Sequence, residues 1–439
     1  MVWSFFFFFL SILKSKVETK MVLLITIVLI SKLHFNESQI ESSMFFLDGM
    51  AMNMAHLSII LSCLALIVYS KSYSYDKSFL CVLSGAIAFV FFHSNNLLLL
   101  FVLFEASLIP LMTLIVGWGK QPERLLASQY IMIYTLFSSF PLLCFMIWVE
   151  DLESLFSMMN PILKTNYFSF WFSSLNLIVC VSFLLAFLVK VPIFFLHSWL
   201  PKAHVEASLE GSIILAGIML KVGTFGIFRL ISLFPSTSVS SVSTILFCIS
   251  ILGSVLSILM AVSSDDLKLS IALSSVSHMN FLLGSLFSMK EFTFSMTSFT
   301  MISHGFSSSI LFFFVTIIYE VNNSRSLALV KGSMSKVPSI LLLSFLFFSI
   351  SIALPPSLAF YGEMLSISSI WSFSVESIPL VCMFVMFNSF YSMMNYGVMN
   401  QSAKGKYPQN SHFETIFNMS SMVSLVIIVM TFFFPESVN

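Results

Sequence analysis

The stretch FCISILGSVLSILMAV, residues 247–262, contains no charged side chain and consists of apolar and small residues. An apolar run of about 20 residues can cross a bilayer as an α-helix, and similar runs recur along the whole chain. A membrane β-barrel would show alternating apolar and polar residues instead. The continuous runs therefore predict an all-α polytopic membrane protein.

Composition supports this fold class. Hydrophobic residues make up 58% of the 439-residue chain and charged residues 9%, whereas soluble globular proteins carry about 25% charged residues. The net charge is zero, so nothing points to nucleic acid as a partner. The six cysteines lie singly in apolar runs without metal-ligand spacing, so we expect packing thiols and neither a metal site nor an iron–sulfur cluster: Cys63, Cys81, Cys144, Cys180, Cys248 and Cys382.

We count about fourteen apolar segments. They cover residues 2–13, 21–34, 52–70, 79–93, 95–116, 126–148, 172–196, 208–233, 241–262, 267–288, 294–319, 337–373, 378–399 and 418–434. The first two are short and could form one interfacial piece and one span. The N-terminus could pass for a signal peptide, but it lacks a basic leader and a small-residue cleavage site, which favours an uncleaved first span.

Two segments are interrupted by proline. Residues 188–201 read LVKVPIFFLHSWLP, with Pro192 after Lys190, and residues 352–363 carry Pro355 and Pro356 ahead of Glu363. A broken helix at membrane depth usually lines a buried or hydrated cavity. The breaks lie five segments apart, so we predict one transmembrane domain, 1–439, with two five-helix repeats at 79–233 and 241–399 and flanking helices in 1–78 and 400–439.

Four charged residues lie inside the apolar segments: Glu105, Lys190, Lys221 and Glu363. A charge at membrane depth costs at least about 2.5–3.5 kcal/mol and by default marks an ion or proton path. Any one of these four residues could instead belong to an ion pair with a purely structural role. Burial favours the neutral form of a lysine, and a nearby carboxylate favours the charged form. We therefore hypothesise that Glu105 lies close to Lys190 and that their approach and separation load and release a proton.

The sizes of the opposing energies agree with this hypothesis. A glutamate about 4 Å from a lysine attracts it by about 4 kcal/mol at an effective dielectric constant near 20. Moving a proton across about 150 mV needs roughly 3.5 kcal/mol. A change in one such contact could therefore drive one proton against the membrane potential.

Four histidines extend the set of titratable groups. His278 and His304 lie in serine-containing apolar helices, where an imidazole can relay a proton or can simply join two helices by hydrogen bonds. His197 and His204 flank the loop HSWLPKAH and are either loop relays or structural residues.

Several of these stretches resemble the chain 4 family of mitochondrial NADH-ubiquinone oxidoreductases. The similar strings include WGKQPER at 118–124, HSWLPKAHVEA at 197–207, GIMLKVGTFGIFRL at 217–230, DLKLSIALSSVSHMN at 266–280 and LPPSLAFYGE at 354–363. Their order and spacing match over roughly residues 90–370. This chain departs from the family pattern at three positions. It has Ser208 where the family commonly has proline, an unusual Glu210 nearby, and an extra Asp265.

The resemblance implies fourteen helices in two inverted five-helix repeats. It also implies a proton path with Glu105 paired to Lys190, Lys221 as the central relay, His278 and His304 as relay histidines, and Glu363 toward the exit. It implies a multi-pass subunit of the mitochondrial inner membrane, whose partners include other membrane-arm subunits such as the antiporter-like chains 2 and 5. The chain itself would bind no cofactor, because NADH, FMN, iron–sulfur clusters and quinone would belong to partner subunits.

Two other functions compete with a redox-driven proton pump. A subunit of a multisubunit cation/proton antiporter would share the fold and the buried Lys and Glu pattern. A membrane scaffold without transport would need no charges beside the two proline breaks.

Overall fold

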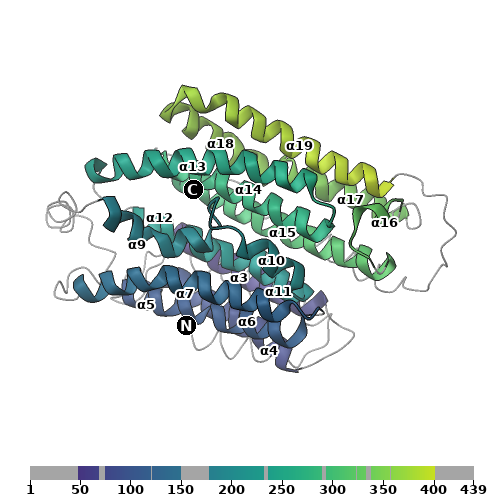
Figure 1. The fold of residues 1–439 in the computed structure, drawn as a ribbon, viewed down its shortest axis with the longest axis horizontal. Helices are drawn as coiled ribbons and strands as arrows, with labels where there is room; N and C mark the ends of the chain where they lie inside the picture. Colours follow the sequence, from purple (N-terminus) through teal and green to yellow (C-terminus); the bar gives the residue numbers. More distant parts are fainter. Residues whose placement is uncertain are drawn as a thin grey trace. The chain divides into compact units, whose positions relative to one another are not determined.

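The computed structural model describes residues 48–68, 75–119, 121–149, 177–231, 236–288, 293–322, 324–332, 338–355 and 357–400. Within these ranges the regular structure is helical (Figure 1). The chain divides into two compact units, Met1–Leu246 and Phe247–Asn439. The expected segments at 2–13, 21–34 and 418–434 lie outside the described residues.

Unit 1 contains the helices before residue 247. They are α3 (Gly49–Val68), α4 (Tyr75–His93), α5 (Leu97–Ala106), α6 (Leu108–Trp118), α7 (Arg124–Val149), α9 (Leu177–Lys190), α10 (Trp199–Glu206), α11 (Leu209–Ile214), the π-helix η2 (Leu215–Met219) and α12 (Leu220–Ile231). Helix α13 (Ser236–Ser263) begins in unit 1 and ends in unit 2.

Unit 2 contains the remaining helices. They are α14 (Leu267–Phe287), α15 (Thr293–Asn322), α16 (Leu327–Val330), α17 (Pro338–Ser351), α18 (Leu358–Phe373), the 3-10 turn η4 (Val375–Ser377) and α19 (Ile378–Asn400). The extra Asp265 contributes its backbone, since its carbonyl accepts a hydrogen bond from Leu327 N–H at 2.8 Å and thereby ties the start of α14 to α16.

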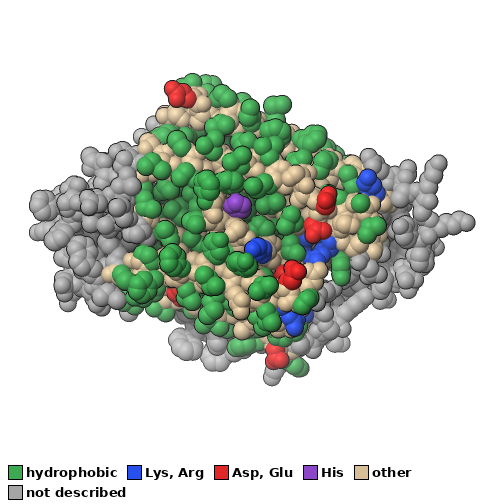
Figure 2. Space-filling model, viewed as in Figure 1, with side chains coloured by type: hydrophobic (Ala, Val, Ile, Leu, Met, Phe, Trp, Pro, Cys, Tyr) green, Lys and Arg blue, Asp and Glu red, His purple; other side chains and the backbone are tan. Residues whose placement is uncertain are grey.

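Nine stretches in the described ranges are long and apolar enough to cross a membrane. They correspond to nine of the expected segments, and the two expected segments that contain the proline breaks are divided into shorter helices. Exposed apolar side chains are abundant, for example Phe137 at 79% and Met386 at 69%. Figure 2 shows hydrophobic side chains over most of the described surface on the face in view, as expected for a surface in contact with lipid.

Both proline breaks are present. Helix α9 ends at Lys190 and α10 begins at Trp199, while α17 ends at Ser351 and α18 begins at Leu358. Each break contains a non-glycine residue with positive φ, Phe195 at 79° and Ala353 at 63°. Left-handed backbone costs a non-glycine residue about 1–2 kcal/mol, so the surrounding packing must hold both breaks in place.

Candidate functional site

Lys190 of unit 1 is fully buried at the end of α9, one turn before the first break. Its side-chain nitrogen Nζ donates to the carbonyl of Phe104 at 2.8 Å and to the hydroxyl of Ser107 at 2.9 Å. Nζ also lies 3.5 Å from the centre of the Phe104 ring. Its binding groups therefore lie where α5 ends and α6 begins.

Glu105 lies next in sequence to Phe104 and within electrostatic range of Lys190. In the part of the chain that the structure describes, no ion pair joins the two side chains. The buried carboxylate oxygen Oε1 of Glu105 has no hydrogen-bond partner. Glu105 and Lys190 are therefore near each other but not in contact in this conformation. The Phe104 carbonyl and the Ser107 hydroxyl, rather than Glu105, accept the hydrogen bonds of Lys190.

Lys221 is fully buried at the second residue of α12. Its Nζ donates to the carbonyl of Ala216 at 2.7 Å. Ala216 belongs to the π-helix, in which the hydrogen bonds skip one more residue than in an α-helix. Such bulges are rare and often occur at functional sites.

The helices that carry the two lysines approach closely because of a glycine. A Cβ at Gly223 would lie 2.5 Å from Cγ2 of Val191 and 3.2 Å from Cβ of Lys190. Only glycine fits α12 against the end of α9 at this point. The packing thus brings the backbone near Lys221 up to Lys190.

Of the two loop histidines, His197 lies within the first break and His204 lies beyond it. His197 is partly buried and its ring stacks on Phe194, with centroids 5.0 Å apart. His204, in α10, is fully buried. The break is closed by Trp199, whose indole N–H donates to the Val189 carbonyl at 3.0 Å.

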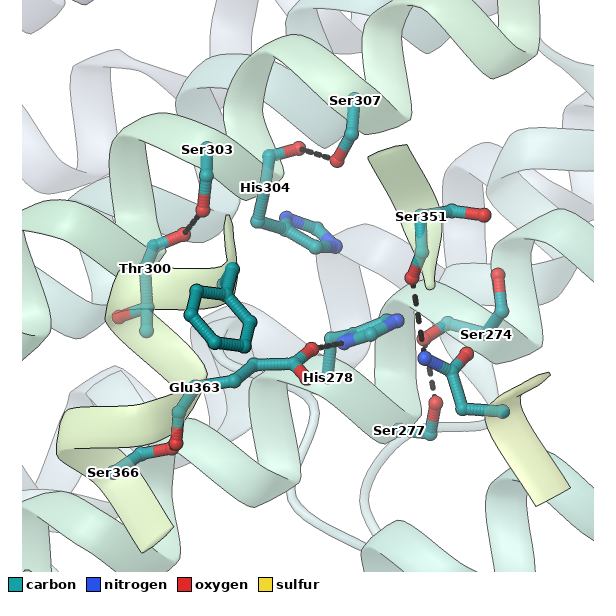
Figure 3. Close-up of polar contacts among 12 residues, drawn as sticks. Ser274, Ser277, His278, Thr300, Ser303, His304, Ser307, Ser351, Glu363 and Ser366 are labelled. Carbon is teal, nitrogen blue, oxygen red and sulfur yellow. Dashed lines mark hydrogen bonds and ion pairs between the residues drawn. The ribbon is translucent and has the colours of Figure 1, made fainter. Parts of the chain in front are cut away.

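Three of the predicted residues come together in unit 2 (Figure 3). Nδ1 of His278, on α14, lies 3.5 Å from Oε1 of Glu363, on α18. The ring of His304, on α15, lies 5.9 Å from that of His278, centre to centre. The approach of α18 depends on Gly362, where a Cβ would lie 2.6 Å from Cγ2 of Thr300.

A cavity of about 40 Å³ lies among these side chains. A water needs roughly 10–15 Å³ measured in this way, so the space suits about three waters. Hydroxyls and imidazoles make the lining polar enough to hold them. The lining comprises His278, Met279, Phe281, Leu282, Thr300, Ser303, His304, Ser307, Ile350, Ser351, Ala359 and Glu363.

Sequence reasoning missed the polar stripe of α19. Asn388 contacts His278 and donates to the carbonyl of Ser351 at 3.1 Å, at the end of α17. Tyr391 lies near Ser270, Ser274 and Asn395. The spacing of Asn388, Tyr391 and Asn395 by three and four residues is the helical signal that could have identified this face.

Comparison with known proteins agrees with this arrangement. The model of the NADH:quinone oxidoreductase/Mrp antiporter transmembrane family matches residues 94–394. NADH-ubiquinone oxidoreductase chain 4 of Locusta migratoria is 38% identical over 385 residues, which cover 87% of this chain and 85% of that protein. Chain 4 of Albinaria caerulea is 37% identical, with 71% and 70% covered.

Solved structures share the fold. A chain of respiratory complex I from Thermus thermophilus with bound NADH superposes with a TM-score of 0.80 at 21% identity, covering 98% of this chain and 95% of that one. A chain of an archaeal membrane-bound sulfane sulfur reductase gives 0.81 at 16% identity, covering 99% and 93%. With the family model matched over more than half of its length, the chain belongs to the NADH:quinone oxidoreductase/Mrp antiporter transmembrane family.

Proposed function

We propose that this chain is a proton-translocating membrane subunit of the respiratory NADH:ubiquinone oxidoreductase. Electron transfer from NADH to quinone takes place in partner subunits, which hold the cofactors, and it drives protons through the side chains described above. The observation that carries the proposal is the placement of buried or partly buried titratable groups beside a broken helix in each unit. Lys190 lies at the first break, and Glu363 follows the second.

In unit 1 the groups that would carry the proton are Glu105, Lys190 and Lys221. Lys190 is held by uncharged acceptors, so it can gain or lose a proton without breaking an ion pair. Motion of the Glu105 carboxylate toward Lys190 would favour the charged lysine, and motion away would favour release. We assign relay roles to His197, which lies within the break, and to His204, which lies beyond it.

In unit 2, Glu363, His278 and His304 surround a space for water. A proton on Glu363 could pass to His278 directly, and from there to His304 through a hydrated cavity. Imidazole both accepts and donates protons near neutral pH. We place this group toward the exit of the path.

Similarity to relatives favours this function over its competitors. The cation/proton antiporter alternative shares the fold, so the fold does not decide between them. Relatives 37–38% identical over most of the chain are all named as chain 4 of NADH-ubiquinone oxidoreductase. We therefore also propose a mitochondrial inner-membrane location, two inverted repeats, fourteen helices in all and neighbours that include the antiporter-like chains 2 and 5.

The deciding experiment is Glu105→Gln in the intact complex. Glutamine keeps the shape of glutamate and removes the charge, so Lys190 loses the attraction that would return it to the charged form. We expect proton pumping and coupled NADH oxidation to fall together by at least about 100-fold, with normal assembly. The pH gradient and NADH oxidation are measured in vesicles.

Glu123→Gln is the matched control, because Glu123 is an exposed carboxylate just before α7. It should behave as the unmodified complex does. A scaffold would show normal turnover in Glu105→Gln, and that result would refute the proposed function.

A further inference from the structure

A second buried acid–base pair lies in unit 1, away from the lysines at the first break. Nζ of Lys77, in the first turn of α4, lies 3.9 Å from Oε1 of Glu210, in the first turn of α11. Glu210 is 2% exposed and its Oε1 has no hydrogen-bond partner. Nζ of Lys77 also lies 5.7 Å from the centre of the Trp118 ring.

The backbone around Glu210 is fixed by Ser208. Ser208 caps α11, and its hydroxyl accepts a hydrogen bond from Gly211 N–H at 3.4 Å. The cap orients the first turn of α11 so that Glu210 lies against α4.

Glu210 is the second residue of the candidate span Leu209–Ile231, and Lys221 lies in the middle of the same span. Lys77 lies in the first turn of the span Tyr75–His93. The pair therefore lies at an end of two spans, close to the water on one side of the membrane. Its partial exposure, 12% for the Lys77 side chain, agrees with that position.

A short distance separates this pair from the central lysine. Lys221 is bonded to the carbonyl of Ala216, which follows Glu210 by six residues, or about 9 Å along a helix. Helix α3 packs on both α11 and η2, and it carries the buried hydroxyls of Ser58 and Ser62. Both hydroxyls donate to carbonyls of α3, Ser58 to Ala55 at 2.7 Å and Ser62 to Ile59 at 2.9 Å, and each oxygen can still accept a hydrogen bond from water.

We propose that Glu210 and Lys77 form a proton-uptake site that supplies Lys221. The Glu210 carboxylate takes a proton from the adjacent aqueous phase and becomes a neutral acid; it then gives that proton, by way of hydroxyls and water, to the neutral amine of Lys221. The positive charge of Lys77 stabilises the deprotonated Glu210 carboxylate and so favours release of the proton. This proposal rests on the proposed function, because it assigns a source to the protons that Lys221 relays.

Other titratable groups surround α11. The elements packed on it carry several: Tyr75, Asp76, Lys77, Cys81 and His93 on α4, His56 and Cys63 on α3, and Lys202, His204 and Glu206 on α10. Helix α6 and the π-helix η2 contribute none. Cys81 lies within electrostatic range of both members of the pair. The pH response of uptake therefore has to be tested through the pair itself rather than inferred from one group.

The test compares Glu210→Gln, Glu210→Asp, Lys77→Met and the double variant Glu210→Gln/Lys77→Met in the intact complex. We expect Glu210→Gln to slow pumping about tenfold above neutral pH, less than the roughly 100-fold typical of a chemical step because water substitutes in part. The loss should shrink at acidic pH, where hydronium is abundant. Glu210→Asp should keep most of the rate.

Lys77→Met should shift the pH dependence of pumping in the direction opposite to the alkaline loss expected for Glu210→Gln. Without the cation, the Glu210 carboxylate holds its proton more tightly, so release slows and the activity profile moves to higher pH. Thermal stability and assembly are measured for every variant, with Glu123→Gln as the control for a lost surface charge.

The double variant separates uptake from a purely structural ion pair. Removing one member of a structural pair leaves a buried charge without its partner, whereas removing both restores stability. If the pair takes up protons, the double variant assembles normally yet stays slow at alkaline pH. Normal rate and pH profile in the double variant would overturn the uptake site. If Glu105→Gln is also normal, the transport function itself is wrong.

Discussion

At the scale of single residues, the fully buried Lys190 and Lys221 each donate to a backbone carbonyl. Lys190 donates to the Phe104 carbonyl and Lys221 to the Ala216 carbonyl. A neutral amine can keep one such bond, and an ammonium can keep it too. Each site therefore tolerates both protonation states, which a lysine locked in a buried ion pair would not do.

Lys221→Met tests whether the charge of this residue is needed for turnover and not for folding. Methionine has similar length and replaces a buried polar group by an apolar one, so stability should be unchanged or higher. Pumping should fall by at least about 100-fold if Lys221 relays protons. Assembly is followed by native electrophoresis and pumping by a pH-sensitive dye in vesicles.

Lys202→Met serves as the comparison, since Lys202 is exposed on α10 and lies over the Tyr130 ring at 3.7 Å. It should pump normally. A Lys221→Met complex with full activity would contradict the relay role.

Sequence reasoning at this scale identified which residues are unusual, but not what satisfies them. The charges of Glu105, Lys190, Lys221 and Glu363 are conspicuous in apolar runs. The acceptors of the two lysines include the backbone carbonyls of Phe104 and Ala216, and a backbone carbonyl leaves no trace in the composition. The direct Glu105–Lys190 contact expected from charge alone is replaced here by such acceptors.

At the scale of elements, the broken helices were predictable where proline marks them. The breaks after Lys190 and Ser351 lie at the prolines that the sequence singles out. The division between α5 and α6 at Ser107 and the π-helix before Lys221 were not predicted. Pro110 lacks the backbone N–H that would bond to the carbonyl of Ala106, so the division at Ser107 has a local cause in the sequence. The π-helix contains Gly217 but no proline, and its position depends on tertiary contacts.

Gly362→Ala tests how tightly α18 must pack for Glu363 to reach His278. The added methyl would lie 2.6 Å from Cγ2 of Thr300 and 3.0 Å from its backbone N, so α18 must move away from α15. Overpacking of this kind costs about 1–3 kcal/mol. We expect a lower melting temperature and slower pumping.

Gly397→Ala is the matched substitution, because nothing lies within 4 Å of a Cβ at Gly397 in α19. There alanine should stabilise the helix by up to about 1 kcal/mol. Adding Thr300→Ser to Gly362→Ala removes Cγ2 but not the backbone contact, so it should restore stability in part. Unchanged stability in Gly362→Ala would show that the two helices are not fixed by this contact.

At the scale of the whole molecule, titratable groups are divided between two units that each contain one broken helix. Among the residues discussed, unit 1 holds Lys190, Lys221, His197 and His204, and unit 2 holds His278, His304 and Glu363. The fold class and this division of charges followed from apolar runs and prolines. The boundary between the units, inside α13, did not, because an uninterrupted span gives no sign of a boundary.

The double variant Lys221→Met/Glu363→Gln tests whether the two units act in one sequence of steps. Residues that serve one obligatory process show strongly non-additive effects. The double variant should therefore pump as slowly as the slower single variant and no more slowly. Independent losses that multiply would show that the units act separately.

Lys221→Met combined with Glu376→Gln provides the reference for this comparison, since Glu376 is an exposed carboxylate in η4. Its rate should equal that of Lys221→Met alone. Rates are taken from the initial slope of the pH gradient at equal amounts of assembled complex.

The π-helix Leu215–Met219 also restricts how this span can evolve. In an α-helix each residue turns the chain by about 100°, so a single insertion or deletion rotates everything on one side of it. Here the span is fixed at both ends, by Glu210 near Lys77 and by Arg229, which pairs with Asp48 at 2.7 Å. Deleting one residue between Glu210 and Arg229 would rotate one of them away from its ion-pair partner. A substitution leaves the rotational position of every residue about the helix axis unchanged. A relative that keeps both ion pairs is therefore expected to keep the number of residues from 210 to 229 as well.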